Sequence, residues 1–123
     1  MTRHRSFSPD YAGAARTWFE EVLQAARDVH VMGERRAAEG ILLSMDRWFI
    51  DRDAVRHGAS PLTELAMVVS AILGDGTLPR PTAGDYAPET SVLGNPIGAH
   101  ITLTFDDADL LGHAVLEAIP VGR

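Results

Sequence analysis

Four histidine–acid pairs in this chain have the spacing that places two side chains on one face of a helix. The pairs, each four residues apart, are His30 with Glu34, Asp53 with His57, Asp109 with His113, and His113 with Glu117. Side chains at this spacing are neighbours on a helix surface, so Asp109, His113 and Glu117 would form a carboxylate–imidazole–carboxylate row. Such a row could hold a divalent metal ion or position the histidine for acid–base chemistry.

A solvent-exposed charged face is the alternative interpretation of this row. Ion pairs at this spacing are common on helix surfaces. The row also lies opposite an apolar face formed by Ala108, Leu111 and Val115. We therefore favour an exposed face that holds no metal ion. His30 and His57, each close to a glycine, are interpreted as partners of helix C-terminal dipoles.

Two tryptophans and three polar residues are the candidates for binding a ligand. Trp18 and Trp48 lie on the apolar stripes of two expected helices and could line a pocket, although aromatic residues there are usually core. His100, Asp106 and Asp107 flank an expected strand and could supply polar groups to such a pocket. No Gly-x-Ser-x-Gly motif and no phosphate-binding glycine loop is found, so the catalytic residues are unknown and no cofactor is expected.

The composition restricts the classes of function. A chain of 123 residues predicts a single domain over 1–123, with a basic N-terminal arm at 1–7 and a Gly/Pro-rich loop at 74–98. The absence of cysteine excludes disulfides and Cys-ligated zinc. All eleven basic residues are arginine, which indicates a GC-rich bacterial genome and excludes a lysine Schiff base.

Charge and hydropathy further restrict the partners. A net charge of −6 counts against nucleic acid, because phosphate binding needs a clustered basic face. No apolar stretch approaches the roughly 18 residues that would span a bilayer, and no signal-peptide core follows the basic start. We therefore expect a cytoplasmic protein with no membrane partner.

An apolar stripe near the N-terminus predicts a first helix over about residues 9–32. The stripe repeats at alternating steps of four and three, which fits a helix and no strand. Ser8 is a suitable N-cap for this helix, and Trp18, at the middle of the stripe, is expected in the core. The stripe consists of Tyr11, Ala15, Trp18, Val22, Ala25, Val29 and Met32.

Two further helices follow. The apolar positions between 37 and 49 are rotated relative to the first stripe, so Gly33 lies either in a helical hairpin or within one long helix. We favour the hairpin, because it lets one chain close its own core. After Ser60-Pro61 comes a helix that is apolar nearly all round and stops at Gly74. It should form the buried centre of the fold, with Val69 in the core.

The last third of the chain changes its periodicity. Residues 100–105 alternate apolar and polar side chains and predict a strand. Its partner would be Val92-Leu93, another segment of the loop, or a second subunit. Residues 106–109 then resemble a capped start for a C-terminal helix. The fold class is therefore mainly α (α+β), with a minor β element.

Two hypotheses about function remain. The first is a small acidic interaction protein, either a homodimer or an accessory subunit that binds another protein. It is favoured because it requires no motif that the sequence lacks. The alternative is a small-ligand-binding protein or enzyme, with a pocket between the helices and the loop at 74–98.

Overall fold

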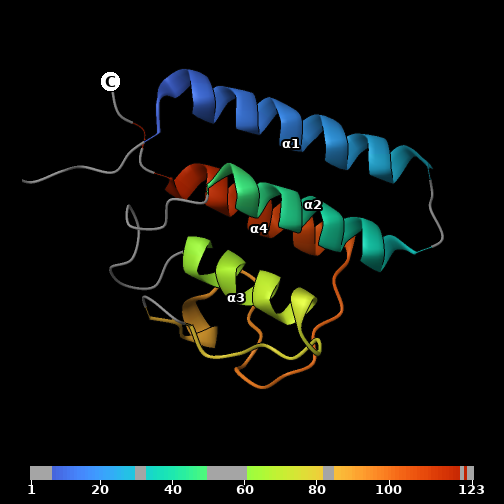
Figure 1. The fold of residues 1–123 in the computed structure, drawn as a ribbon, viewed down its shortest axis with the longest axis vertical. Helices are drawn as coiled ribbons and strands as arrows, with labels where there is room; N and C mark the ends of the chain where they lie inside the picture. The colour runs from blue at the N-terminus through green and yellow to red at the C-terminus, as the bar shows by residue number, and fades with distance from the viewer. Residues whose placement is uncertain (1–6, 30–32, 50–60, 82–84, 120, 122–123) are drawn as a thin grey trace, which may run out of the picture.

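The fold of the chain is known from a computed structural model that describes residues 7–29, 33–49, 61–81, 85–119 and 121. Within these ranges the regular elements are helices, which confirms the mainly helical class (Figure 1). The helices are α1 (Pro9–Val29), α2 (Glu34–Trp48), α3 (Pro61–Leu73) and α4 (Phe105–Ala118), with a short 3-10 turn, η2 (Pro88–Thr90). None of the described helices has the length and apolar character needed to cross a bilayer.

The helices form three layers. α1 lies on one side, α2 and α4 lie side by side in the middle, and α3 lies on the other side (Figure 1). Both outer helices contact both middle ones, whereas α1 and α3 do not touch. α1 and α2 run in opposite directions, so the helical hairpin is confirmed. Gly33 precedes α2 with φ 99°, a left-handed conformation that glycine adopts without strain.

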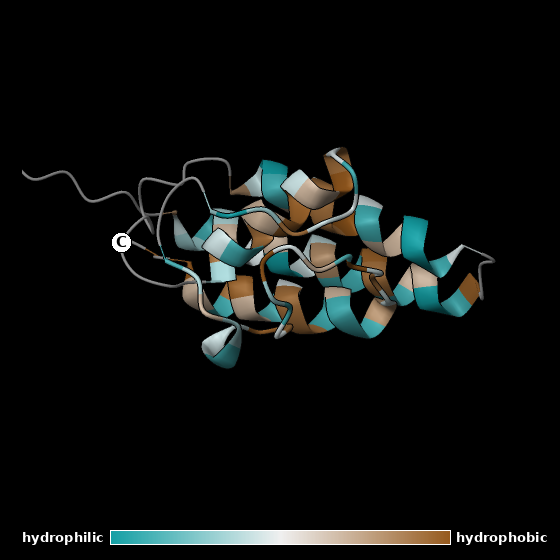
Figure 2. Ribbon diagram, turned by 90° about the horizontal axis from the view of Figure 1, so that it is seen from below, coloured by the Kyte–Doolittle hydropathy of each residue, from teal (hydrophilic) through white to brown (hydrophobic). Residues whose placement is uncertain are grey.

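α3 is buried as predicted, but not because it lies at the centre. Val69 is 7% exposed, which confirms it as a core residue. One side of α3 packs on α2 and α4. Residues 76–81 and 85–104 cover its other side and contribute Leu78, Ile101 and Leu103 to the core (Figures 1 and 2). An outer helix therefore needs apolar residues all round, because a loop takes the place of a second helical layer.

The centre of the buried face of α1 was predicted wrongly. Ala15, Phe19 and Leu23 are buried, whereas Trp18 is only partly buried against the core. α1 straddles α2 and α4, and its two flanks differ in chemistry. Arg16 and Arg27 pair with acids of α4, while the Tyr11 and Trp18 rings contact Trp48 of α2. The helix ends at Val29, and Met32 lies outside the described residues.

The expected strand at 100–105 is not formed within the described residues. The predicted alternation in burial is present, with Ile101 and Leu103 buried and Thr102 exposed between them. Pairing is limited to an isolated antiparallel bridge between Thr77 and His100, with hydrogen bonds on either side of it. The partner is thus another loop segment, residues 76–78. The pairing ends at Leu78, whose carbonyl accepts a hydrogen bond from Gly98 N.

The starts of the helices are fixed by short side chains. Ser8 Oγ accepts a hydrogen bond from Tyr11 N at 3.1 Å, as expected for the N-cap of α1. The C-terminal helix begins at Phe105, with Thr104 as its N-cap and Asp107 completing a capping box. The expectation of a start at Asp106 was therefore wrong, because the Thr-x-x-Asp pattern lies two residues earlier.

Candidate functional site

The seam between α1 and α4 brings His113 between two carboxylates. His113 Nδ1 lies 2.6 Å from Asp109 Oδ1, and His113 Nε2 lies 3.1 Å from Glu20 Oε2. The imidazole and the Phe19 ring form a T-shaped contact, with centroids 5.1 Å apart and planes at 81°. Sequence spacing had paired Asp109 with His113. Glu20 was missed, because it comes from a helix about 90 residues away in sequence.

Glu117 does not join this group. Its carboxylate lies 3.3 Å from Arg16 Nη2, on α1. At the other end of the seam, Arg27 Nη2 lies 3.1 Å from both Asp106 Oδ1 and Asp109 Oδ2. The expected row of Asp109, His113 and Glu117 is thus divided between partners on α1.

The two carboxylates change the proton affinity of His113. Burial lowers the pKa and is the largest single influence, but the hydrogen bonds to Glu20 and Asp109 together outweigh it, so the pKa is raised above its ordinary 6.5. Across the described residues, no group of three or more His, Asp or Glu side chains has an arrangement for a metal ion. Chemically, this site can hold a proton and link two helices.

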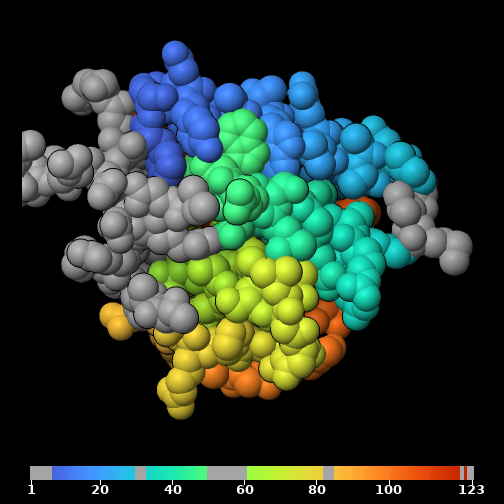
Figure 3. Space-filling view, in the orientation of Figure 1, coloured from blue at the N-terminus to red at the C-terminus, as the bar shows by residue number. Residues whose placement is uncertain are grey.

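A second candidate site lies where α1 and α2 meet. The Trp48 ring lies 5.7 Å from the Trp18 ring and 5.2 Å from the Tyr11 ring, and Tyr11 Oη donates to the Trp48 carbonyl at 2.6 Å. An open groove of about 430 Å³ is lined by Tyr11, Ser44, Arg47 and Trp48. We call Tyr11, Trp18, Ser44, Arg47 and Trp48 the α1–α2 surface. Figure 3 shows α1 and α2 side by side on this side of the molecule.

The α1–α2 surface combines exposure with residue types that favour binding. Tyr11 is 39% exposed, and Ser44 and Arg47 are exposed. No hydrogen bond or ion pair of Arg47 is found within the described part of the chain. Tyrosine, tryptophan and arginine are the types that contribute most to protein–protein binding energy. The surface can therefore accept an apolar partner that carries an acidic group.

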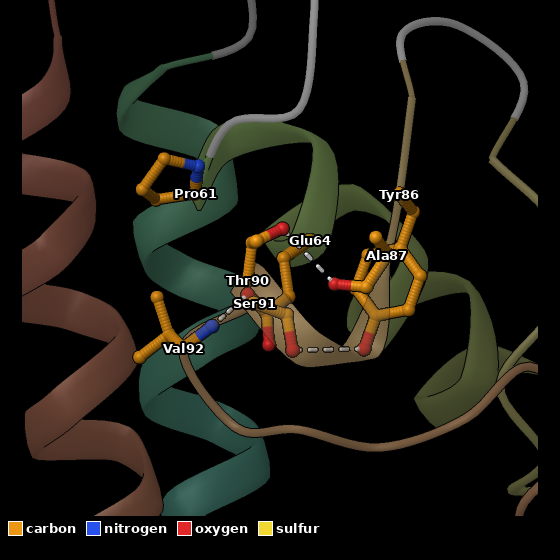
Figure 4. Close-up of a pocket in the computed structure, with 7 residues that line it drawn as sticks. All are labelled: Pro61, Glu64, Tyr86, Ala87, Thr90, Ser91 and Val92. Atoms are coloured by element: carbon orange, nitrogen blue, oxygen red, sulfur yellow. Dashed lines mark hydrogen bonds between the residues drawn. The ribbon is translucent and has the colours of Figure 1, made fainter.

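A third candidate site contains a buried carboxylate. Glu64 is 2% exposed, and one of its oxygens accepts a hydrogen bond from Val92 N at 2.8 Å (Figure 4). The other accepts a hydrogen bond from Leu93 N at 2.9 Å. The sequence analysis did not identify Glu64 as a candidate. The available signal was that Glu64 is the only charged residue in the mainly apolar segment 61–73. We call this pair of hydrogen bonds the Glu64 latch, because it attaches the loop to α3.

A cavity next to the latch lies where the sequence placed a ligand pocket. Its volume is about 50 Å³, and it is lined by Pro61, Glu64, Tyr86, Ala87, Thr90, Ser91 and Val92 (Figure 4). Burial, opposed by the hydrogen bond with Ser91, raises the pKa of Tyr86 above its ordinary 10.0. Its hydroxyl therefore stays protonated and donates to the Asn95 carbonyl. Since one water needs about 10–15 Å³, the cavity has room for only a few waters.

The remaining candidates are distributed over separate places. Trp18 and Trp48 contact one another on the α1–α2 surface. His100 lies against Gly76, where an added Cβ would approach the imidazole to 2.8 Å. Asp106 is paired with Arg27, and Asp107 caps α4. No contact found among the described residues joins His100 to Asp106 or Asp107. His30, Asp53 and His57 lie outside the described residues.

Comparisons with protein-family models, with curated proteins and with solved structures find no match to this chain. Its function is therefore argued from its own residues.

Proposed function

We propose that this chain is a non-catalytic interaction protein that binds a protein partner through the α1–α2 surface. The supporting observation is the exposed Arg47 beside the Tyr11 and Trp48 rings, with no partner for its guanidinium in the described part of the chain. An exposed arginine next to aromatic rings gives little stability to its own fold. It becomes useful when a partner supplies a carboxylate and covers the rings.

The shapes of the two hollows support this choice over the ligand-pocket alternative. Small-molecule sites are mostly enclosed and measure about 300–1,000 Å³. The cavity at the Glu64 latch is about 50 Å³, and both carboxylate oxygens already accept backbone hydrogen bonds. The groove at Tyr11 and Trp48 is large but open, which suits the side chains of a protein partner better than a small molecule.

Site-specific photocross-linking tests this proposal. Benzoylphenylalanine is placed at position 44, inside the α1–α2 surface, or at position 89, an exposed loop position outside it. We expect a discrete adduct from position 44, none from position 89, and loss of the adduct when Arg47→Glu is added. Equal adducts from both positions, or an adduct that persists with Arg47→Glu, would contradict the proposal, as would no adduct at all.

A further inference from the structure

We infer that the partner on the α1–α2 surface is a second copy of this chain, related to the first by a two-fold axis. This inference rests on the proposed function and names the occupant of the same surface. The surface is bordered by unlike charges on its two helices, and those charges have the arrangement that a self-complementary contact requires.

The acidic border lies on α1. Asp10 and Glu21 are eleven residues apart, a spacing that keeps two side chains on one face of a helix. Both are exposed, and Glu21 follows Trp18 by three residues, so it stands next to the aromatic part of the surface. No ion pair of either carboxylate is found among the described residues.

The basic border lies on α2. Arg36 and Arg47 are also eleven residues apart and exposed, and Ser44 lies on the same face between them. Arg36 has an ion pair with Glu39 at 3.2 Å, while Arg47 has none in the described chain. At 1.5 Å of rise per residue, the two acids and the two arginines each span about 16 Å along their helices.

A two-fold axis in the plane of contact, parallel to the helices, would place α1 of each copy over α2 of the other. Because α1 and α2 are antiparallel, Asp10 would then face Arg47 of the partner subunit, and Glu21 would face Arg36 of the partner subunit. The symmetry repeats both contacts, as in any isologous interface. Tyr11, Trp18 and Trp48 would be covered between the two charged borders.

The exposed Gly40 fits this arrangement. It lies in the middle of α2, one turn before Ser44, and a Cβ added there would meet nothing within 4 Å. Glycine inside a helix is about 1 kcal/mol less favourable than alanine, so packing within the described chain gives no reason for it. A standard interface buries about 800 Å² on each partner, which requires contact along both helices, including the region of Gly40. Close approach of the partner helix would explain the glycine.

The charged borders matter because the net charge opposes association. Each copy carries −6, so two copies repel one another unless local contacts compensate. Reversing one arginine in the interface adds repulsion and removes a contact in the same step. Arg47 is therefore the most sensitive position for a test.

The test is sedimentation equilibrium of the purified full chain over a range of micromolar concentrations. We expect a species of twice the chain mass of 13.3 kDa. Arg47→Glu should raise the dissociation constant of the dimer about tenfold or more. Arg80→Glu is the matched control, because Arg80 is an exposed arginine on the loop. It makes the same change in net charge away from the surface, so it measures the effect of net charge alone and should weaken the dimer much less than Arg47→Glu does.

A charge exchange tests the pairing itself. Glu21→Arg alone should weaken the dimer, and Glu21→Arg combined with Arg36→Glu should strengthen it again. A monomer at all concentrations, a dimer insensitive to Arg47→Glu, or a double variant as weak as Glu21→Arg would overturn the inference. The cross-link from position 44 separates this failure from failure of the proposed function. An adduct whose mass is not that of two chains would support the α1–α2 surface as a binding site but contradict a second copy as its partner. The absence of any adduct would contradict the surface itself.

Discussion

Phe19 of α1 packs directly against Gly112 of α4, and the ring of Phe19 fills the space that a Gly112 side chain would need. A Cβ built on Gly112 would overlap three ring carbons of Phe19. Both residues are buried, and the same ring contacts the imidazole of His113, one residue further along α4. The His113 contacts with α1 therefore depend on a glycine that lets the helices approach.

Gly112→Ala should destabilise the fold strongly. The Phe19 ring is fully buried, so it cannot rotate into solvent to make room for the added methyl group. The two helices must therefore move apart. Overpacking of this kind costs about 1–3 kcal/mol or more, which exceeds the gain in helix propensity. Chemical denaturation measures the change in the free energy of unfolding.

Gly13→Ala is the control for this substitution. Gly13 lies within α1, and a Cβ there would meet nothing within 4 Å. The expected effect is a gain of about 0.5–1 kcal/mol from helix propensity alone. If both alanine variants were equally stable, the close approach of Phe19 to Gly112 would be wrong.

The contrast between Phe19 and Trp18 gives a second prediction. Phe19→Ala should cost about 3–5 kcal/mol, the range for a fully buried aromatic residue. Trp18→Ala should cost less, because Trp18 is only partly buried and loses mainly its contact with the Trp48 ring. Thermal unfolding of both variants below the concentration at which the chain associates would rank them. A larger loss of stability for Trp18→Ala would contradict the placement of Phe19 at the centre of the buried face of α1.

The same pair of residues illustrates what the sequence could and could not predict. Local signals, such as the helical stripes, Gly33 and the Ser8-Pro9 start, were sufficient to find the helices and the hairpin. The direction in which α1 faces was not local information. On one flank of α1, Arg16 and Arg27 have acidic partners on α4 that lie about 80 to 100 residues away in the sequence.

For the candidate sites too, local signals were predictable from the sequence and contacts between distant residues were not. The spacing of Asp109 and His113 on one helix predicted their contact, whereas Glu20 came from another helix and could not be found by spacing. The prediction of a strand at 100–105 was wrong for a similar reason. Its alternation was correct for burial, but pairing required a partner segment longer than residues 76–78.

The third prediction concerns pH. Because the pKa of His113 is raised in the folded state, the folded protein binds this proton more tightly than the unfolded chain does. The resulting stability is fully present below pH 6.5, the ordinary histidine pKa, and is lost as the pH rises through the folded pKa. The stability difference between the wild type and His113→Gln should therefore decrease across this window.

Nuclear magnetic resonance titration of the His113 ring protons measures the cause directly. We expect a pKa above 6.5 in the wild type and a lower value in Glu20→Gln, which replaces the charged acceptor at Nε2 with a neutral amide. A wild-type pKa at or below 6.5 would show that burial outweighs the two carboxylates.

The fourth prediction concerns the Glu64 latch. Glu64→Gln leaves one oxygen to accept a backbone N–H and turns an amide group toward the other, so one of the Val92 and Leu93 donors loses its acceptor. An unsatisfied buried donor costs about 1–3 kcal/mol, and removal of the charge weakens the remaining hydrogen bond. The loop should then separate from α3 more often while the helices stay packed.

Hydrogen exchange would show this as faster exchange of the Val92 and Leu93 amides, with little change at the core of α4. Glu89→Gln, at an exposed position in η2, makes the same chemical change and should leave both amides as protected as in the wild type. Equal exchange at these amides in Glu64→Gln and the wild type would mean that other contacts hold the loop in place.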